Sequence, residues 1–151
     1  MLSFFMLFVG GCSEPGSNAH SSSADPAAND STHTVFLSVV SDVNQDPQSV
    51  DMALKFAGFS LEENRNVILF FNVKGVHIPT QTMSDDTAFK DNEPIKKQLA
   101  SLISKGAKVH VCPICMKALG VDASDLIEGA EVTTRPGLFS YIGSDTTVFT
   151  Y

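Results

Sequence analysis

The stretch that decides the fold is Asn66-Val67-Ile68-Leu69-Phe70-Phe71-Asn72-Val73, in which five large apolar residues stand in a row between two asparagines. A strand with one wet face alternates polar and apolar side chains, whereas a strand covered on both faces is continuously apolar. Parallel sheets are covered on both faces because their crossover connections carry helices. The stretch therefore predicts a central strand over residues 66–73 of a mainly parallel sheet.

Strand and helix patterns alternate on both sides of this stretch. Upstream, the apolar run at 34–40 predicts a strand, and apolar residues spaced by four, three and four predict a helix over 46–64, at Val50, Leu54, Ala57 and Leu61. Downstream, the patterns predict a helix at 93–104, a strand at 107–111, a short helix at 113–119, a helical turn within 121–127, a strand at 130–133, a helix at 136–142 and a strand at 146–151. This alternation is typical of βαβ units. We expect an α/β fold: a three-layer, flavodoxin-like domain with a mainly parallel sheet of about five strands.

The N-terminal residues predict export. Met1 to Val9 is almost wholly apolar, too short to span a bilayer as a helix, and fits the apolar region of a secretory signal. Val9-Gly10-Gly11-Cys12 resembles a bacterial lipobox, in which Cys12 carries the lipid and becomes the mature N-terminus. The alternative is an apolar tail without a sorting role. The lipobox predicts a protein of the cell envelope, lipid-anchored and facing the periplasm or exterior, with the anchor as its only membrane contact.

Residues 13–33 contain no large apolar residue, so they predict a disordered linker. The domain organisation is then a signal peptide with lipobox at 1–12, the linker at 13–33 and one α/β domain at 34–151. The formal net charge of −7 argues against DNA, RNA or anionic lipid as the main partner, because each is a polyanion.

The chemistry is expected at the carboxyl edge of the sheet, where open α/β sheets bind their ligands. That rule selects residues 41–44, the long loop at 74–92 and the Cys-x-x-C motif at 112–115. In the same region, Asp85-Asp86 is interpreted as a solvated turn, and Lys96-Lys97 as the wet face of a helix.

Cys112-Pro113-Ile114-Cys115 lies where a strand ends and a helix begins. Free backbone N–H groups and the helix dipole favour a thiolate at such a position, and the thiolate is the nucleophilic form. Cys115, one turn later, is a candidate resolving thiol for a species formed on Cys112. His77, in the loop after the central strand, is a candidate acid–base partner. This interpretation requires no metal and no organic cofactor.

Two other interpretations of the cysteine pair stay open at this point. Export would place the pair in an oxidising compartment, where Cys112 and Cys115 could form a static disulfide. Alternatively, Cys112 could bind a soft metal ion together with His110, which is predicted on the same side of its strand, and the nearby Met116. A closed zinc site usually has four ligands, and only one Cys-x-x-C is present.

Several short segments, in this order and spacing, carry a resemblance to the DsrE/DsrF-like family over residues 34–151. They are Ala53-Leu54-Lys55-Phe56-Ala57, Val67-Ile68-Leu69-Phe70-Phe71 leading into Gly75-Val76, Cys112 followed by Gly120-Val121, and Asp125-Leu126-Ile127 followed by Gly129-Ala130. The resemblance implies a three-layer parallel sheet and a homo-oligomer. It also implies that sulfur is carried as a persulfide at Cys112, the position after the third strand, and exchanged with a sulfur donor or acceptor protein.

The leading hypothesis is an exported, lipoprotein-type DsrE-like protein with thiol or persulfide chemistry on Cys112, assisted by Cys115 and His77. The alternative is a non-catalytic module of the same fold that binds a soft metal or a partner protein.

Overall fold

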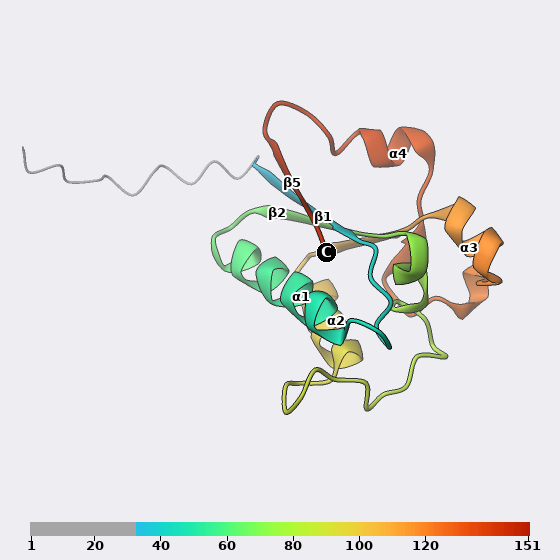
Figure 1. The fold of residues 1–151 in the computed structure, drawn as a ribbon. Helices are drawn as coiled ribbons and strands as arrows, with labels where there is room; N and C mark the ends of the chain where they lie inside the picture. Colours follow the sequence, from blue (N-terminus) through green and yellow to red (C-terminus); the bar gives the residue numbers. More distant parts are fainter. Residues whose placement is uncertain (1–32) are drawn as a thin grey trace, which may run out of the picture.

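Five strands form one sheet in the order β4-β3-β2-β1-β5, and every neighbouring pair is parallel (Figure 1). The computed structural model describes residues 33–151, so the predicted signal, lipidation site at Cys12 and most of the predicted linker lie outside the described residues. The strands are β1 (Thr34–Val39), β2 (Asn66–Phe71), β3 (Lys108–Val111), β4 (Ala130–Val132) and β5 (Thr146–Thr150). The α/β fold with a parallel sheet is thereby confirmed.

The apolar stretch from Val67 to Phe71 lies in β2, the middle strand of this sheet. In β2, Val67, Ile68 and Leu69 are completely buried, as expected of a strand that is covered on both faces. The strand ends at Phe71 and not at the predicted Val73. Val73 has a left-handed backbone, with φ of 49°, and opens a short 3₁₀ helix, η1 (Val73–His77), at the start of the predicted loop.

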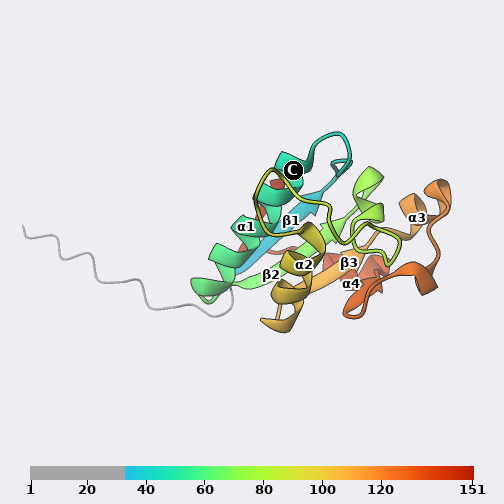
Figure 2. The same ribbon diagram turned by 90° about the horizontal axis from the view of Figure 1, so that it is seen from below.

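The main core lies between the sheet and two helices, α1 (Pro47–Glu62) and α2 (Ile95–Ser104). Both helices lie below the sheet in Figure 1 and in front of it in Figure 2. Alternate strand residues point into this core: Val35, Leu37, Val39, Val67, Leu69, Phe71, Val109 and Val111. Helix α1 begins as predicted, because the Asp46 carboxylate accepts a hydrogen bond from the Ser49 backbone N–H and Pro47 occupies the first turn.

The opposite face of the sheet is covered by the connection between β4 and β5, which contains the short helix α4 (Arg135–Phe139) (Figure 1). The strand residues on this face include Phe36, Ile68 and His110, and all three are buried. The His110 ring packs beside the ring of Tyr141, with 5.1 Å between the centroids. Helices on both faces complete the three layers.

Helix α3 (Pro113–Leu119) and the 3₁₀ turn η2 (Ala123–Asp125) lie beyond the carboxyl ends of the strands, next to η1 (Figure 1). The chain runs in one direction across the sheet from β1 to β4 and then returns to place β5 on the other side of β1. The reversal of strand order therefore falls at β1, which is where open α/β sheets place ligands. Within residues 33–151, no helix combines the length and apolar character needed to cross a membrane.

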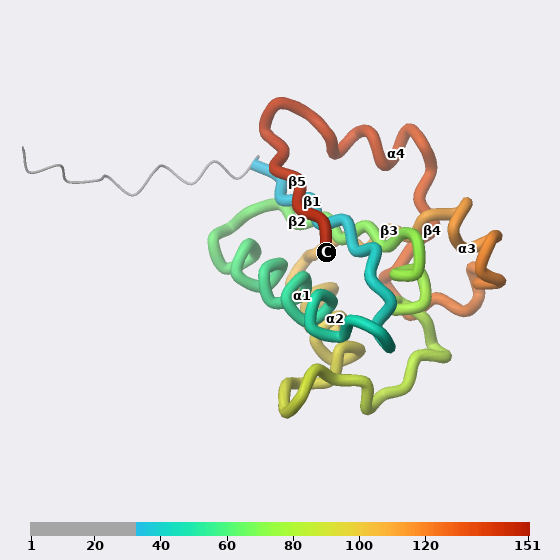
Figure 3. Tube along the Cα trace, in the orientation of Figure 1, coloured from blue at the N-terminus to red at the C-terminus, as the bar shows by residue number. Residues whose placement is uncertain are grey.

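The segment 78–94 is a strap on the α1–α2 side of the molecule (Figure 3). It is pinned to the chain before β4, since Thr80 bridges Leu126 and the Ile127 N–H donates to the Pro79 carbonyl. The expectation that Lys96 lies on a wet helix face is wrong. Its side chain is 23% exposed, and its ammonium donates to the backbone carbonyls of Gln81 and Met83 and to the Asp85 carboxylate.

Candidate functional site

Cys112 joins the end of β3 to the start of α3. Its backbone N–H donates to the Phe71 carbonyl at 2.9 Å, which extends the pairing of β2 and β3 by one residue. Its own carbonyl accepts from the Met116 N–H at 3.0 Å, which closes the first turn of α3. Pro113 occupies the first helical position, and Gly120, with φ of 70°, ends the helix. The predicted strand-to-helix junction at Cys112 is therefore confirmed.

The thiols of Cys112 and Cys115 are both free and half-buried, and each side chain packs partly against the main core. The residues around them on α3 are open to solvent: Ile114 is 78% exposed, and Pro113 and Lys117 are exposed as well. The pair thus lies at the boundary between core and solvent, where a sulfur can be both held in place and reached from outside.

The Cys115 sulfur accepts a hydrogen bond from a distant part of the chain. The backbone N–H of Val73 donates to it across 3.2 Å, from the start of η1. Burial is the main cause that raises the pKa of the Cys115 thiol, the neighbouring Cys112 side chain raises it further, and the Val73 N–H opposes this rise. A raised pKa favours the protonated form, so the surroundings of Cys115 favour its neutral thiol.

The Val73 N–H is aimed at Cys115 by an unusual backbone turn. A β-branched residue rarely adopts a positive φ, and Val73 does so at the point where β2 ends. Gly75 allows this turn, because a Cβ at that position would lie 2.2 Å from the carbonyl oxygen of Val39. The Asn72 side chain adds a hydrogen bond of 2.9 Å to the Ser38 hydroxyl. The turn that delivers the N–H is therefore held against β1.

Sequence reasoning did not find Val73 and Gly75 as contributors to the site. The Val73 side chain takes no part in the contact, so no side-chain pattern could point to it. Gly75 did offer a signal, since a glycine directly after a buried strand often marks a close approach of two backbones.

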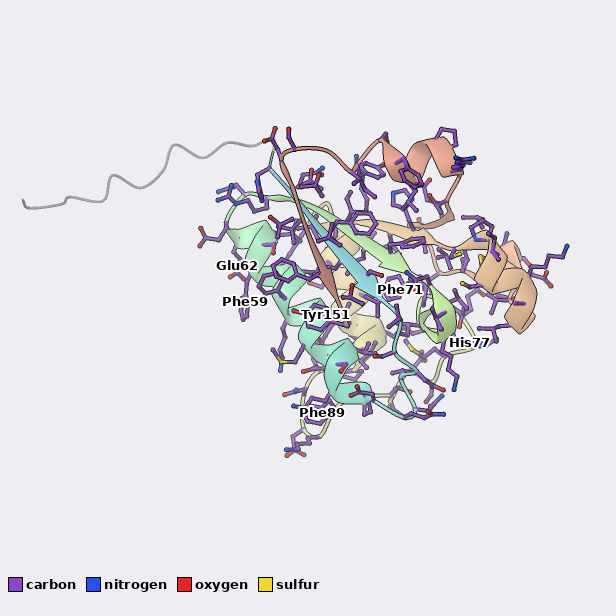
Figure 4. The ribbon with its side chains drawn as sticks, turned by 45° about the horizontal axis from the view of Figure 1, so that its top comes forward. Phe59, Glu62, Phe71, His77, Phe89 and Tyr151 are labelled. Carbon is purple, nitrogen blue, oxygen red and sulfur yellow. The ribbon has the colours of Figure 1, made fainter. Side chains whose placement is uncertain are left out.

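His77 lies at the other end of η1, with an exposed side chain (Figure 4). It lines a polar hollow of about 420 Å³ beyond the end of β1, which also includes Asp42, Asn44 and Thr82. The hydrogen bond from the Asn44 N–H is the main cause that lowers the pKa of Asp42, and Lys74 lies 3.5 Å from the same carboxylate. Among residues 33–151, no hydrogen bond links His77 to Cys112 or Cys115, so its role as their acid–base partner stays a prediction.

The structure does not gather the soft-metal ligand set considered from the sequence. His110 faces the α4 side of the sheet, 3.2 Å from a Glu131 carboxylate oxygen, and so is not on the side of Cys112. Met116 is buried in the main core. Within the described part of the chain, no three His, Cys, Asp or Glu side chains are grouped so that they could hold one ion.

The fold and the site together define a class: single-sheet parallel α/β domains with one cysteine at the junction of the third strand and the next helix. The model of the DsrE/DsrF-like family matches residues 34–151, and the chain belongs to this family. The resemblance seen in the sequence is thereby confirmed.

Two relatives from archaea cover most of the described domain. The chain is 28% identical over 116 residues to "Uncharacterized protein MJ0989" of Methanocaldococcus jannaschii, which covers 77% of this chain and 98% of that protein. It is 29% identical over 116 residues to "Uncharacterized protein MK0008" of Methanopyrus kandleri, with 76% and 93% covered.

Two solved structures share the fold. The ychN protein from E. coli aligns with a TM-score of 0.57 and 17% identity, covering 79% of this chain and 98% of that one. A protein of unknown function, MTH1491 from Methanobacterium thermoautotrophicum, aligns with a TM-score of 0.54 and 15% identity, covering 78% and 97%. At these identities the likeness concerns the fold alone.

Proposed function

We propose that this protein is a cell-envelope sulfur-transfer protein in which Cys112 carries sulfur as a persulfide and Cys115 assists. The observation that carries the proposal is the inequality of the two thiols. Burial and the neighbouring Cys112 raise the pKa of Cys115, whereas Cys112 stands at the junction of β3 and α3, just before Pro113 opens the helix. Free backbone N–H groups at the start of a helix favour a thiolate, and the thiolate is the nucleophile. Membership of the DsrE/DsrF-like family supports a sulfur-relay role.

The proposed loading step is a thiol exchange. The Cys112 thiolate attacks the outer sulfur of a persulfide on a donor, a new S–S bond forms on Cys112, and the donor's inner sulfur leaves as a thiolate. The number of S–S bonds is unchanged, so no outside oxidant is needed. An acceptor thiolate then takes the outer sulfur by the same reaction, and Cys112 leaves as a thiolate.

Cys115 provides a second way to unload Cys112. Its thiolate attacks the inner sulfur of the persulfide, hydrosulfide leaves, and a Cys112–Cys115 disulfide remains. An external dithiol then reduces this disulfide and is itself oxidised. The Val73 N–H at 3.2 Å would stabilise the charge that Cys115 acquires when it loses its proton.

The donor and acceptor are proposed to be proteins that dock around α3. Ile114 is 78% exposed, between the two cysteines in the sequence, and Leu119 at the end of the helix is 41% exposed. Apolar side chains of this kind form the centre of transient protein contacts. The same surface supports the second candidate function, a module that binds a partner protein without chemistry.

The cell-envelope location rests on the lipobox-like Val9-Gly10-Gly11-Cys12. Its test is a Cys12→Ala variant expressed in a bacterium with radiolabelled palmitate. The parent chain should take up label and sediment with membranes, and the variant should do neither. A parent chain that takes up no label would contradict the location and leave the sulfur chemistry to be tested separately.

The chemistry is tested by incubating the reduced chain with a persulfide donor and weighing the intact protein by mass spectrometry. The parent and a Cys115→Ser variant should both gain one sulfur atom, with the variant holding it longer because the internal attack is lost. A Cys112→Ser variant should gain none. Loading that survives in Cys112→Ser would exclude Cys112 as the carrier, and a parent chain that never loads would favour the binding module.

A further inference from the structure

A second site lies on the α4 face of the sheet, away from the thiol pair. A small hollow of about 150 Å³ opens there between the end of β3, strand β4 and helix α4. Its lining includes His110, Glu131, Thr133 and Tyr141. None of these residues takes part in the proposed sulfur transfer.

His110 is the unusual residue in this hollow. Its side chain is almost fully buried, and neither ring nitrogen has a hydrogen-bond partner among residues 33–151. Buried polar atoms in folded proteins nearly always have hydrogen-bond partners, so a ring in which both nitrogens lack one requires an explanation. Histidine is also the side chain that most commonly binds transition metals in proteins, through a neutral ring nitrogen.

Glu131 lies next to His110, with a side chain that is 68% exposed. Its Oε1 lies 3.2 Å from His110 Nδ1, yet the two atoms are not aligned as a hydrogen bond. Zinc lies about 2.0–2.2 Å from histidine nitrogen and carboxylate oxygen, so two such ligands at a tetrahedral angle lie about 3.3 Å apart. Both strands hold this spacing, since His110 and Glu131 are directly paired in the register of β3 and β4.

We propose that His110 Nδ1 and Glu131 Oε1 bind one divalent transition-metal ion of the zinc type, with the remaining coordination positions open to water. Lys108 is the positive group that opposes a cation here, and its ammonium lies over the Tyr141 ring at 5.0 Å from the centroid. An ion held by two protein ligands exchanges readily, so the site would respond to the supply of free metal.

The test removes the thiols first, because cysteine would otherwise dominate metal binding. The full chain carrying Cys12→Ser, Cys112→Ser and Cys115→Ser is titrated with Co²⁺, followed by visible absorption, and with Zn²⁺ by equilibrium dialysis. We expect one ion per chain. A Glu131→Gln substitution should weaken binding by about a hundredfold, since the loss of even an outer-shell partner costs about 10–100-fold in metal affinity.

The matched control is Glu128→Gln, at an exposed glutamate in the connection just before β4, which should leave the affinity unchanged. His110→Gln should abolish binding, and circular dichroism checks that this buried variant still folds. If the chain without thiols shows no saturable metal binding, the proposal is overturned and the hollow holds ordered water only. Equal affinities for Glu131→Gln and Glu128→Gln would overturn it as well. Neither result bears on persulfide loading at Cys112.

Discussion

At the scale of single residues, the two cysteines of the motif differ because their surroundings differ. The Cys115 sulfur accepts a hydrogen bond from the Val73 N–H and burial raises its pKa, whereas Cys112 stands at the start of a helix without a side-chain hydrogen bond to that helix. The difference does not follow from the motif itself, in which both residues are simply cysteine. It comes from η1, which reaches across from β2.

The first prediction concerns the acidity of Cys115. Replacing Cys112 by alanine removes the side-chain and charge effects that help to raise the Cys115 pKa, while burial, the largest cause, remains. The pKa should fall partway toward that of an ordinary thiol. Because alkylation requires the thiolate, the pH–rate profile of iodoacetamide reaction at Cys115 should move to lower pH. Ile114→Ala serves as the control and should not move it. A profile that stays in place or shifts to higher pH would show that Cys112 does not raise the pKa of Cys115.

The second prediction concerns Gly75. In Gly75→Ala, the new Cβ would clash with the Val39 carbonyl oxygen, so the turn that aims Val73 must shift. Overpacking of this kind costs about 1–3 kcal/mol, measured by urea unfolding. Gly58→Ala is the matched control. Gly58 lies inside helix α1, and a Cβ there would make an ordinary contact of 3.8 Å with Leu102. Gly58→Ala should therefore stabilise the protein by about 0.5–1 kcal/mol. Equal effects of the two variants would count against a tight approach at Gly75.

At the scale of elements, the strap 78–94 is a long irregular segment with a fixed path. Loops of this length without regular structure are usually mobile or functional. Here one lysine from α2 binds two strap carbonyls and one strap carboxylate, and Thr80 joins the strap to Leu126. The strap carries Thr82, Ser84 and Thr87 along the hollow that His77 also lines. Fixing the strap therefore fixes one wall of that hollow.

The third prediction follows from this anchoring. In Lys96→Ala, the carbonyls of Gln81 and Met83 lose their donor, so amide hydrogens over residues 81–87 should exchange faster with solvent. Exchange in β2 should be unaffected. Lys97→Ala, at the exposed neighbour, should change neither segment. Hydrogen exchange is measured by mass spectrometry. If the exchange rate over residues 81–87 is unchanged in Lys96→Ala, the backbone pairing of the strap is sufficient to hold it.

At the scale of the whole molecule, one buried carboxylate ties together three parts of the α1–α2 layer. Asp51 on α1 is 1% exposed. It accepts hydrogen bonds from Asn92 at 2.8 Å and Gln98 at 2.9 Å, and pairs with Lys55 at 2.9 Å. These partners come from the strap, α2 and α1. The layer that covers one face of the sheet is therefore joined by polar contacts as well as by its apolar core.

The fourth prediction tests this joint. Asp51→Ala leaves the partly buried amide groups of Asn92 and Gln98 without their acceptor, which should lower the free energy of unfolding by about 3 kcal/mol. Glu62→Ala, at an exposed position near the end of the same helix, should change it by no more than about 0.5 kcal/mol. Urea denaturation followed by circular dichroism compares the two. A loss in Asp51→Ala as small as in the control would mean that the polar joint does not contribute to stability.

Oligomer formation belongs to the same scale and stays a prediction. The resemblance implies a homo-oligomer, and light scattering on the purified chain measures its mass directly. A monomer at all concentrations would contradict the expectation.

Much of this architecture could be predicted because it depends on patterns along the chain. Five apolar residues from Val67 to Phe71 specify a strand covered on both faces, and the spacing from Val50 to Leu61 specifies the face that α1 buries. The end of β3 and the start of α3 at Cys112 follow from an apolar run and a proline. The location of the thiol pair was therefore fixed by local signals.

The partners of these residues could not be predicted in the same way. The Cys-x-x-C motif contains no information about the backbone N–H that reaches Cys115 from Val73. Val73 and Cys115 are separated by a βαβ crossover in the sequence. Lys96 and Lys97 look alike in the sequence, and only the path of the strap makes one an anchor and leaves the other in solvent. His110 was expected beside Cys112, but the chain leaves the strand after Val111, so the alternation that would align them stops.

The sequence by itself determined the class of fold, the order of helices and strands, and the place of the cysteines at the carboxyl edge of the sheet, because hydrophobic period, caps and turns act over a few residues. The tertiary structure alone decided which cysteine meets the Val73 N–H, which lysine holds the strap and which carboxylate meets His110. Those outcomes depend on contacts between segments far apart in the chain, and such contacts exist only once the sheet has brought the segments together.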